Sequence, residues 1–178
     1  MTYSVLALDL ATTTGWALHK PGMERPFFGA FRLKAQPEEV GWPCEQLREF
    51  LADQYSMHKF THFVFEAQHA SQRIDMHVLN RLLALGGMVE WFAYRKNAKC
   101  YRIDIGTWRK HFTGRGTGHK AAGIDVKQQC IQICAEYGWH VDVHDAAEAC
   151  GILDYFLTLL PNYERPWRDR RLMTGVRL

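Results

Sequence analysis

Two acidic side chains, Asp9 and Glu66, lie within or at the end of apolar segments. Asp9 interrupts the apolar run V-L-A-L-D-L-A, and a buried carboxylate without a partner is strongly unfavourable. Glu66 ends a second apolar run, F-V-F-E, and α/β sheets bind their ligands at the carboxyl ends of strands. Hydrogen bonds from the neighbouring T-T-T-G turn would also explain the carboxylate of Asp9. A single acid at the end of a strand, such as Glu66, does not by itself define a site.

A second pair of acids lies in H-D-A-A-E-A, where Asp145 and Glu148 are separated by two alanines. On a helix this spacing places both carboxylates on one face, about one turn apart. The helix dipole alone favours acids in a first turn, so this pair too has a purely structural explanation.

The four acids together point to a metal site. Two like charges about 4 Å apart repel by about 4 kcal/mol at an effective dielectric constant of about 20. Four converging carboxylates are therefore tolerated only if they are protonated or hold cations. Oxygen ligands suit Mg²⁺ or Mn²⁺, and two such ions can activate water for phosphodiester hydrolysis.

The hydrophobic pattern predicts the elements that must position these acids. Residues 5–11, 12–20, 27–33, 61–67 and 99–103 have the character of strands, whereas residues 38–55, 74–94, 125–137 and 145–160 have helical spacing. Asp125 is a candidate helix cap. Three strands followed by alternating helices and strands predict a mixed-sheet α/β domain.

The net charge of the chain is only +3, but basic residues are concentrated in two places. Residues 95–127 carry nine basic against two acidic side chains, and the segment from Pro161 carries five arginines against two acids. Residues 106–123 contain five glycines and little apolar periodicity, which predicts a loop or broken helix. Such a segment can approach phosphates, and its candidate DNA contacts are Arg109, Lys110, Arg115 and Lys120.

The length of 178 residues fits one domain, residues 1–160, followed by a basic tail at 161–178. With no secretory signal and no apolar run near 18 residues, we expect a soluble cytoplasmic protein without a membrane partner. The five cysteines have no disulfide framework. Cys130, Cys134, His140 and His144 are residue types that zinc accepts, but the spacing differs from zinc fingers, and the two cysteines share a helical face typical of buried side chains.

The ordered motifs resemble those of the RuvC-type Holliday junction resolvases, especially their phage-like branch. The likeness extends over about residues 3–160 and rests on four motifs: A-L-D-L-A-T-T-T-G-W-A at 7–17, F-V-F-E at 63–66, W-R-K-H-F-T-G-R-G-T-G-H-K at 108–120 and D-A-A-E-A at 145–149. The D-x-x-T-x-T-G type of turn also occurs in actin-like and sugar kinase folds. The combination is the more specific feature.

This resemblance implies a ribonuclease H-like fold, an α/β arrangement with a mixed five-stranded sheet, its first three strands antiparallel, flanked by helices. It implies an endodeoxyribonuclease of DNA recombination and repair, in a bacterium or a phage, that cuts four-way and other branched DNA as a homodimer. Catalysis would use two Mg²⁺ or Mn²⁺ ions, with Asp9 bridging them. The four metal ligands and catalytic residues would be Asp9, Glu66, Asp145 and Glu148. The family usually has aspartate where this chain has Glu148, which leaves open which helical acid contacts which ion.

Three alternatives remain from the sequence. One is a related nuclease acting on RNA or on flaps. Another is an ATP-binding protein of the actin or sugar kinase type, although those proteins repeat the fold over a longer chain. The third is a junction-binding module without catalysis, which would lack at least one of the acids. The helix expected at 74–94 is a candidate dimer face, although its apolar stripe is equally typical of a core-facing helix. Tyr94, Trp108 and Phe112 are aromatic candidates for stacking on a base or for the core.

Overall fold

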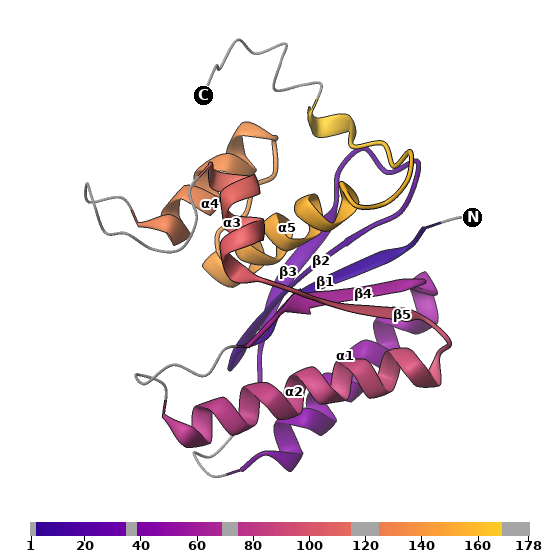
Figure 1. Cartoon of the computed structure of the whole chain (residues 1–178), viewed down its shortest axis with the longest axis vertical. Helices are drawn as coiled ribbons and strands as arrows, with labels where there is room; N and C mark the ends of the chain where they lie inside the picture. Colours follow the sequence, from indigo (N-terminus) through magenta and orange to yellow (C-terminus); the bar gives the residue numbers. More distant parts are fainter. Residues whose placement is uncertain (1–2, 35–38, 69–74, 115–124, 169–178) are drawn as a thin grey trace.

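The computed structural model describes residues 3–34, 39–68, 75–114 and 125–168. This part of the chain forms one mixed sheet between two layers of helices (Figure 1). In chain order the elements are β1 (Val5–Asp9), β2 (Thr13–His19), β3 (Phe27–Arg32), α1 (Gly41–His58), β4 (His62–Glu66), α2 (Met76–Arg95), β5 (Lys99–Ile103), α3 (Ile105–Thr113), α4 (Val126–Glu136) and α5 (His144–Leu157).

The sheet has the strand order β3-β2-β1-β4-β5. β1, β2 and β3 pair antiparallel, whereas β4 is parallel to both β1 and β5. The predicted mixed five-stranded sheet with three antiparallel strands is therefore confirmed. Leu8 is paired with Phe65 in the parallel ladder, so Asp9 and Glu66, the residues that follow them, end neighbouring strands side by side.

One face of the sheet is built from small residues and is covered by α5. Because side chains alternate between the faces of a strand, Val5 and Ala7 of β1 face α5 together with Ala17 and Val64. Within α5, the whole stretch 146–154 is buried. Small side chains on both surfaces allow the helix to pack closely on the strands, and α3 and α4 complete this layer (Figure 1).

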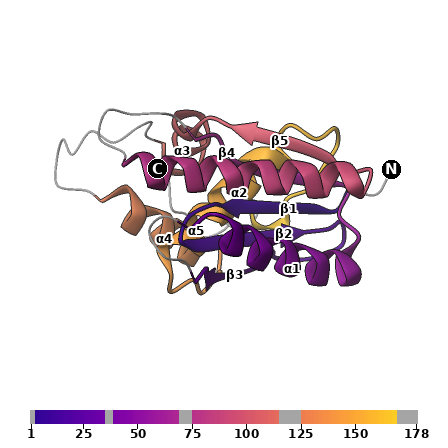
Figure 2. The same ribbon diagram turned by 90° about the horizontal axis from the view of Figure 1, so that it is seen from below.

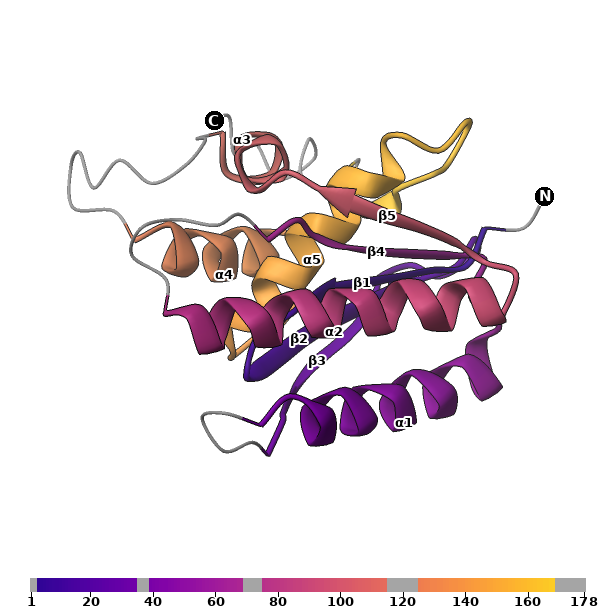
Figure 3. The same cartoon turned by 60° about the horizontal axis from the view of Figure 1, so that its bottom comes forward.

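Larger side chains form a second core on the opposite face. Leu6 and Leu8 of β1 and Phe63 and Phe65 of β4 pack against buried residues of α1 and α2, among them Leu47, Leu51, Leu85 and Val89. Figure 2 and Figure 3 show these two helices running along that face of the sheet. The two cores explain why the central strands appear as continuous apolar runs, since both of their faces are covered.

The prediction of a loop or broken helix over residues 106–123 is wrong for its first half, where α3 is a regular helix. The side chain of Asp104 caps α3 by accepting a hydrogen bond from the amide of Thr107 at 3.0 Å. Trp108 and Phe112, one turn apart, are both buried against α5, and Gly114 ends the helix with a φ of 74°. The remainder, residues 115–124, lies outside the described residues.

The other expected helices are present with shifted ends. Asp125 caps α4 through its contact with the amide of Lys127, as predicted. Cys130 and Cys134 are buried, as their spacing predicts, whereas His140 is exposed. None of the helices in the described ranges is long and apolar enough to cross a bilayer.

Candidate active site

The four predicted acids line one cavity of about 300 Å³. Asp9 ends β1, Glu66 ends β4, and Asp145 and Glu148 lie in the first two turns of α5. In Figure 1 the ends of β1 and β4 and the beginning of α5 lie at the same edge of the sheet, away from the N-terminus. Residues from three distant parts of the chain thus meet at one place.

Burial and the three neighbouring carboxylates all disfavour the ionised form of Asp9. Burial, and then the negative charges of Glu148, Glu66 and Asp145, raise the pKa of Asp9 well above its ordinary value, while Lys127 opposes this shift. A carboxylate whose ionised form is disfavoured by three other carboxylates is stabilised by any cation that enters among them.

The orientation of Glu66 depends on Trp108 of α3. The indole Nε1 donates a hydrogen bond to Oε2 of Glu66 at 2.9 Å. Trp108 is fully buried and packs on Gly151 of α5, where an added Cβ would lie 2.7 Å from the indole ring. Because Trp108 cannot move without disturbing α5, it fixes the carboxylate of Glu66 at the wall of the cavity.

Glu148 is held by two basic side chains. Arg109 of α3 donates from Nη2 to Oε1 of Glu148, and Nζ of Lys127 lies 3.7 Å from Oε2. Glu148 is 3% exposed, so this carboxylate is compensated almost entirely by protein groups. Arg81 of α2 is a third basic residue that lines the cavity.

The donor set fits a divalent cation in its chemistry. Four carboxylates supply oxygen ligands of the kind that Mg²⁺ and Mn²⁺ prefer, and all four line the same cavity. Among the described residues, however, no three His, Cys, Asp or Glu side chains are already arranged to hold a metal ion. Binding a cation would therefore require at least one side chain to change its rotamer. Glu148 would also have to give up its ion pair with Arg109.

The four residues predicted to contact DNA are placed differently from one another. Arg109 lies in the cavity against Glu148, and Lys110 is exposed on α3. Arg115 and Lys120 lie outside the described residues. Of the aromatic candidates, Trp108 and Phe112 belong to the core, whereas Tyr94 is 82% exposed on α2.

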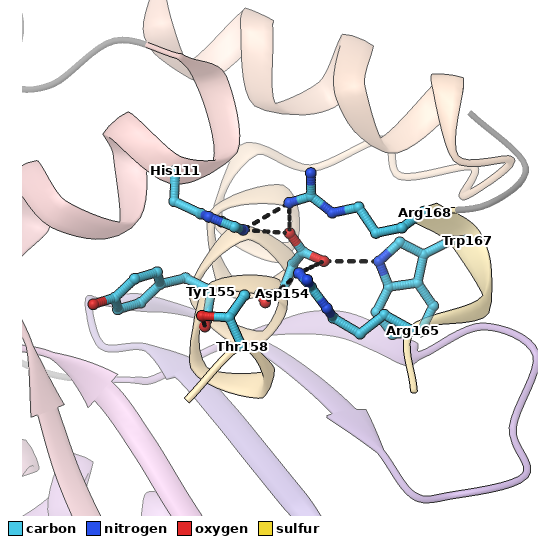
Figure 4. Close-up of polar contacts among 7 residues, drawn as sticks. All are labelled: His111, Asp154, Tyr155, Thr158, Arg165, Trp167 and Arg168. Atoms are coloured by element: carbon cyan, nitrogen blue, oxygen red, sulfur yellow. Dashed lines mark hydrogen bonds and ion pairs between the residues drawn. The ribbon is translucent and has the colours of Figure 1, made fainter. Parts of the chain in front are cut away.

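Sequence reasoning missed a second charged cluster, centred on Asp154 of α5 (Figure 4). The carboxylate is fully buried and accepts a hydrogen bond from Nε1 of Trp167 at 2.7 Å. His111 of α3 lies 3.0 Å from its other oxygen, and Arg165 and Arg168 form ion pairs with it. Burial raises the pKa of Asp154, but the hydrogen bond from His111 and the charge of Arg168 outweigh burial and bring the pKa to about 2. This cluster ties α3 and the segment at 165–168 to α5.

Comparison with known proteins establishes the fold. The sequence matches no protein-family model, and it matches no curated protein at a significant level. The structure is similar to that of Thermus thermophilus RuvC in complex with a Holliday junction substrate, with a TM-score of 0.60 and 14% identity over 84% of this chain and 90% of that chain. A second Thermus thermophilus RuvC structure aligns over 97% of this chain and 96% of its own length, with a TM-score of 0.60 and 11% identity.

The yeast mitochondrial Holliday junction resolvase Ydc2 is also similar, with a TM-score of 0.59 and 9% identity over 96% of this chain and 81% of that chain. The expectation from the sequence motifs is thereby confirmed for the fold. The chain has the mixed five-stranded α/β architecture of the RuvC-type, ribonuclease H-like proteins.

Proposed function

We propose that this protein is a divalent-metal-dependent endonuclease that cuts branched DNA, four-way junctions above all. The observation that carries the proposal is the single cavity lined by Asp9, Glu66, Asp145 and Glu148. The similar structures are those of Holliday junction resolvases, one of them in complex with its junction substrate. Neither the fold nor the four carboxylates separately supports this function as well as their combination.

In this proposal Asp9, Glu66, Asp145 and Glu148 hold Mg²⁺ or Mn²⁺, and two ions fit the number of acids. Two divalent cations supply a water nucleophile at neutral pH and stabilise the leaving oxygen of a phosphodiester. The protein's own part is positioning. Trp108 fixes Glu66, the strand register places Glu66 beside Asp9, and α5 brings both of its acids to the same edge.

We further propose that two copies assemble through α2. Four large apolar residues along this helix, Met76, Leu83, Trp91 and Tyr94, are each at least 46% exposed. Their spacing, with the exposed Gly87 between them, places them along one stripe of the helix. Exposed apolar stripes of this kind mark interaction surfaces, and a two-fold symmetric junction requires paired cuts, which a symmetric dimer provides.

Cleavage of matched substrates tests the proposed function. A synthetic four-way junction, a flap, a linear duplex and an RNA–DNA hybrid of shared sequence are incubated with the protein in Mg²⁺, in Mn²⁺ and in EDTA. We expect paired nicks near the crossover of the junction in either metal and none in EDTA. Preferential cutting of the hybrid or the flap would favour the related nucleases instead, and no cleavage of any substrate would contradict the proposal.

A further inference from the structure

Arg109 has an unusual position for a residue expected to contact DNA, because it faces the acids. Its Nη2 donates to Glu148, its side chain is only 17% exposed, and its guanidinium lies 5.2 Å from the centre of the Trp108 ring. Its Nε is buried and has no hydrogen-bond partner among the described residues. The guanidinium therefore contacts Glu148 through Nη2 without a second hydrogen bond from Nε. It does not form the bidentate pair in which arginine binds carboxylates and phosphates best.

The charges around the cavity show why this contact opposes metal binding. Among the described residues, four carboxylates and three basic side chains, those of Arg81, Arg109 and Lys127, line the cavity, and their formal charges sum to only −1. Two divalent cations added to this set would produce a strong positive excess. Because Arg109 and an incoming cation require the same carboxylate of Glu148, occupation by one weakens occupation by the other.

We propose that Arg109 is an internal counter-cation that holds Glu148 until a divalent cation binds there and then transfers its guanidinium to a DNA phosphate. This inference rests on the proposed function, and it makes Arg109 the link between metal binding and DNA binding. By thermodynamic reciprocity, a cation that releases Arg109 strengthens DNA binding, and DNA that captures Arg109 strengthens cation binding.

Arg109 suits this exchange better than Lys127, which contacts the same carboxylate. Lys127 is 51% exposed and 3.7 Å from Glu148, so water and salt screen its charge. Arg109 extends from a helix that is fixed on both sides of it, by the hydrogen bond of Trp108 to Glu66 and by the contact of His111 with Asp154. Its side chain can therefore change partner while the backbone of α3 stays in place.

Metal affinity without DNA is the first test. Binding of Mn²⁺ is measured by electron paramagnetic resonance for the full chain and for Arg109→Gln, Lys127→Gln and Arg48→Gln. We expect Arg109→Gln to bind Mn²⁺ about tenfold more tightly than wild type, equivalent to about 1.4 kcal/mol. Lys127→Gln removes a charge from the same carboxylate and should change affinity by about threefold or less. Arg48→Gln, on α1, should have no effect, because Arg48 pairs with Glu45 on the surface.

Junction binding is the second test, measured in Ca²⁺ and in EDTA with the DNA checked for intactness on a denaturing gel. We expect Arg109→Gln to weaken binding about tenfold in Ca²⁺, where the guanidinium would reach a phosphate. In EDTA, where it stays on Glu148, the same substitution should change binding by about twofold or less.

Unchanged Mn²⁺ affinity in Arg109→Gln, or an equal loss of junction binding in Ca²⁺ and EDTA, would overturn the inference. If the wild-type protein still cleaves junctions, either result leaves the proposed function intact. A wild-type protein that binds neither Mn²⁺ nor a junction would overturn both.

Discussion

Gly15 of β2 lies directly against the first turn of α5, so that a Cβ atom at Gly15 would collide with the carbonyl oxygen of Asp145 and lie 2.8 Å from the amide nitrogen of Ala146. Gly15 is also the cross-strand partner of Asp9. The absence of one side chain on β2 therefore allows the helix that carries Asp145 and Glu148 to reach the strand that carries Asp9.

Substitution of Gly15 by alanine should displace the beginning of α5. Because the obstructing atoms belong to the backbone, we expect a loss of about 1–3 kcal/mol in the free energy of unfolding together with a severe loss of cleavage. Gly41→Ala is a matched control, since a Cβ at Gly41 meets open space. Urea denaturation of both variants measures the difference, and a Gly15→Ala protein as stable and active as Gly41→Ala would show that this close approach is not needed.

Asp9→Asn should abolish cleavage and yet stabilise the protein in EDTA. Burial and three neighbouring carboxylates raise the pKa of Asp9, so its ionised form costs stability, and the neutral amide removes that cost. In EDTA we expect a higher Tm than wild type and nearly unchanged junction binding. Glu66→Gln should also abolish cleavage while retaining binding. Wild-type cleavage by either variant would remove that residue from the site.

Glu148 is expected to be required for both catalysis and stability. Glu148→Ala leaves Arg109 without its carboxylate partner, and breaking a buried ion pair in this way costs about 3–5 kcal/mol. Glu148→Asp keeps a carboxylate on a shorter side chain, and a displacement of about 1 Å can cost about a hundredfold in rate. We expect Mn²⁺, the more tolerant ion, to restore Glu148→Asp better than Mg²⁺.

Single-turnover cleavage by both Glu148 variants in each metal tests this expectation. If Glu148→Ala remains folded by circular dichroism and cuts within a fewfold of wild type, Glu148 serves only the structure of the helix. In that case Asp9, Glu66 and Asp145 would make up the whole acidic site.

Asp154 predicts a loss of stability in acid. Its pKa is lowered from 3.8 to about 2 in the folded protein, so its contribution is complete above about pH 4 and disappears as the pH falls through 2. The shift corresponds to about 2 kcal/mol. Asp154→Asn should lose this contribution at pH 7 and show a flatter dependence of unfolding free energy on pH between about 4 and 2. Asp53→Asn, at an exposed position of α1, serves as the control and should retain the wild-type slope.

The exposed stripe of α2 predicts the oligomeric state. Trp91→Glu and Leu83→Glu introduce charge at exposed apolar positions of the stripe, so we expect sedimentation to show monomers where the wild type is dimeric. Junction cleavage should then yield single rather than paired nicks. Met57→Glu changes an exposed apolar residue of α1 and should leave the dimer unchanged. A monomeric wild type, or dimeric Trp91→Glu and Leu83→Glu variants, would exclude this face.

The sheet and the acids were predictable because burial imposes strong constraints on sequence. A carboxylate within an apolar strand is rare unless something compensates it, and this identified Asp9. Glu66 was identified by its place at the carboxyl end of a strand, where α/β sheets bind ligands. α3 was missed because only two buried aromatic residues, Trp108 and Phe112, mark its inner face, and glycines lie near both of its ends.

Contacts between residues far apart in the chain are harder to predict from the sequence. The hydrogen bond from Trp108 to Glu66 spans 42 residues, and no local pattern reveals it. Asp154 differs, because it stands within the apolar run G-I-L-D-Y-F-L. The cost of burying a charge applies to this position as it does to Asp9, and it would have predicted a compensated buried carboxylate.

The helix α2 carries both a wall of the acidic cavity and the exposed apolar stripe. Val78, Arg81 and Leu82 near its beginning line the cavity, whereas Trp91 and Tyr94 near its end are exposed. An α-helix of 20 residues is a stiff rod about 30 Å long. The wall of the acidic cavity and the far end of the exposed stripe therefore belong to one stiff element, the helix that Figure 3 shows running along the sheet.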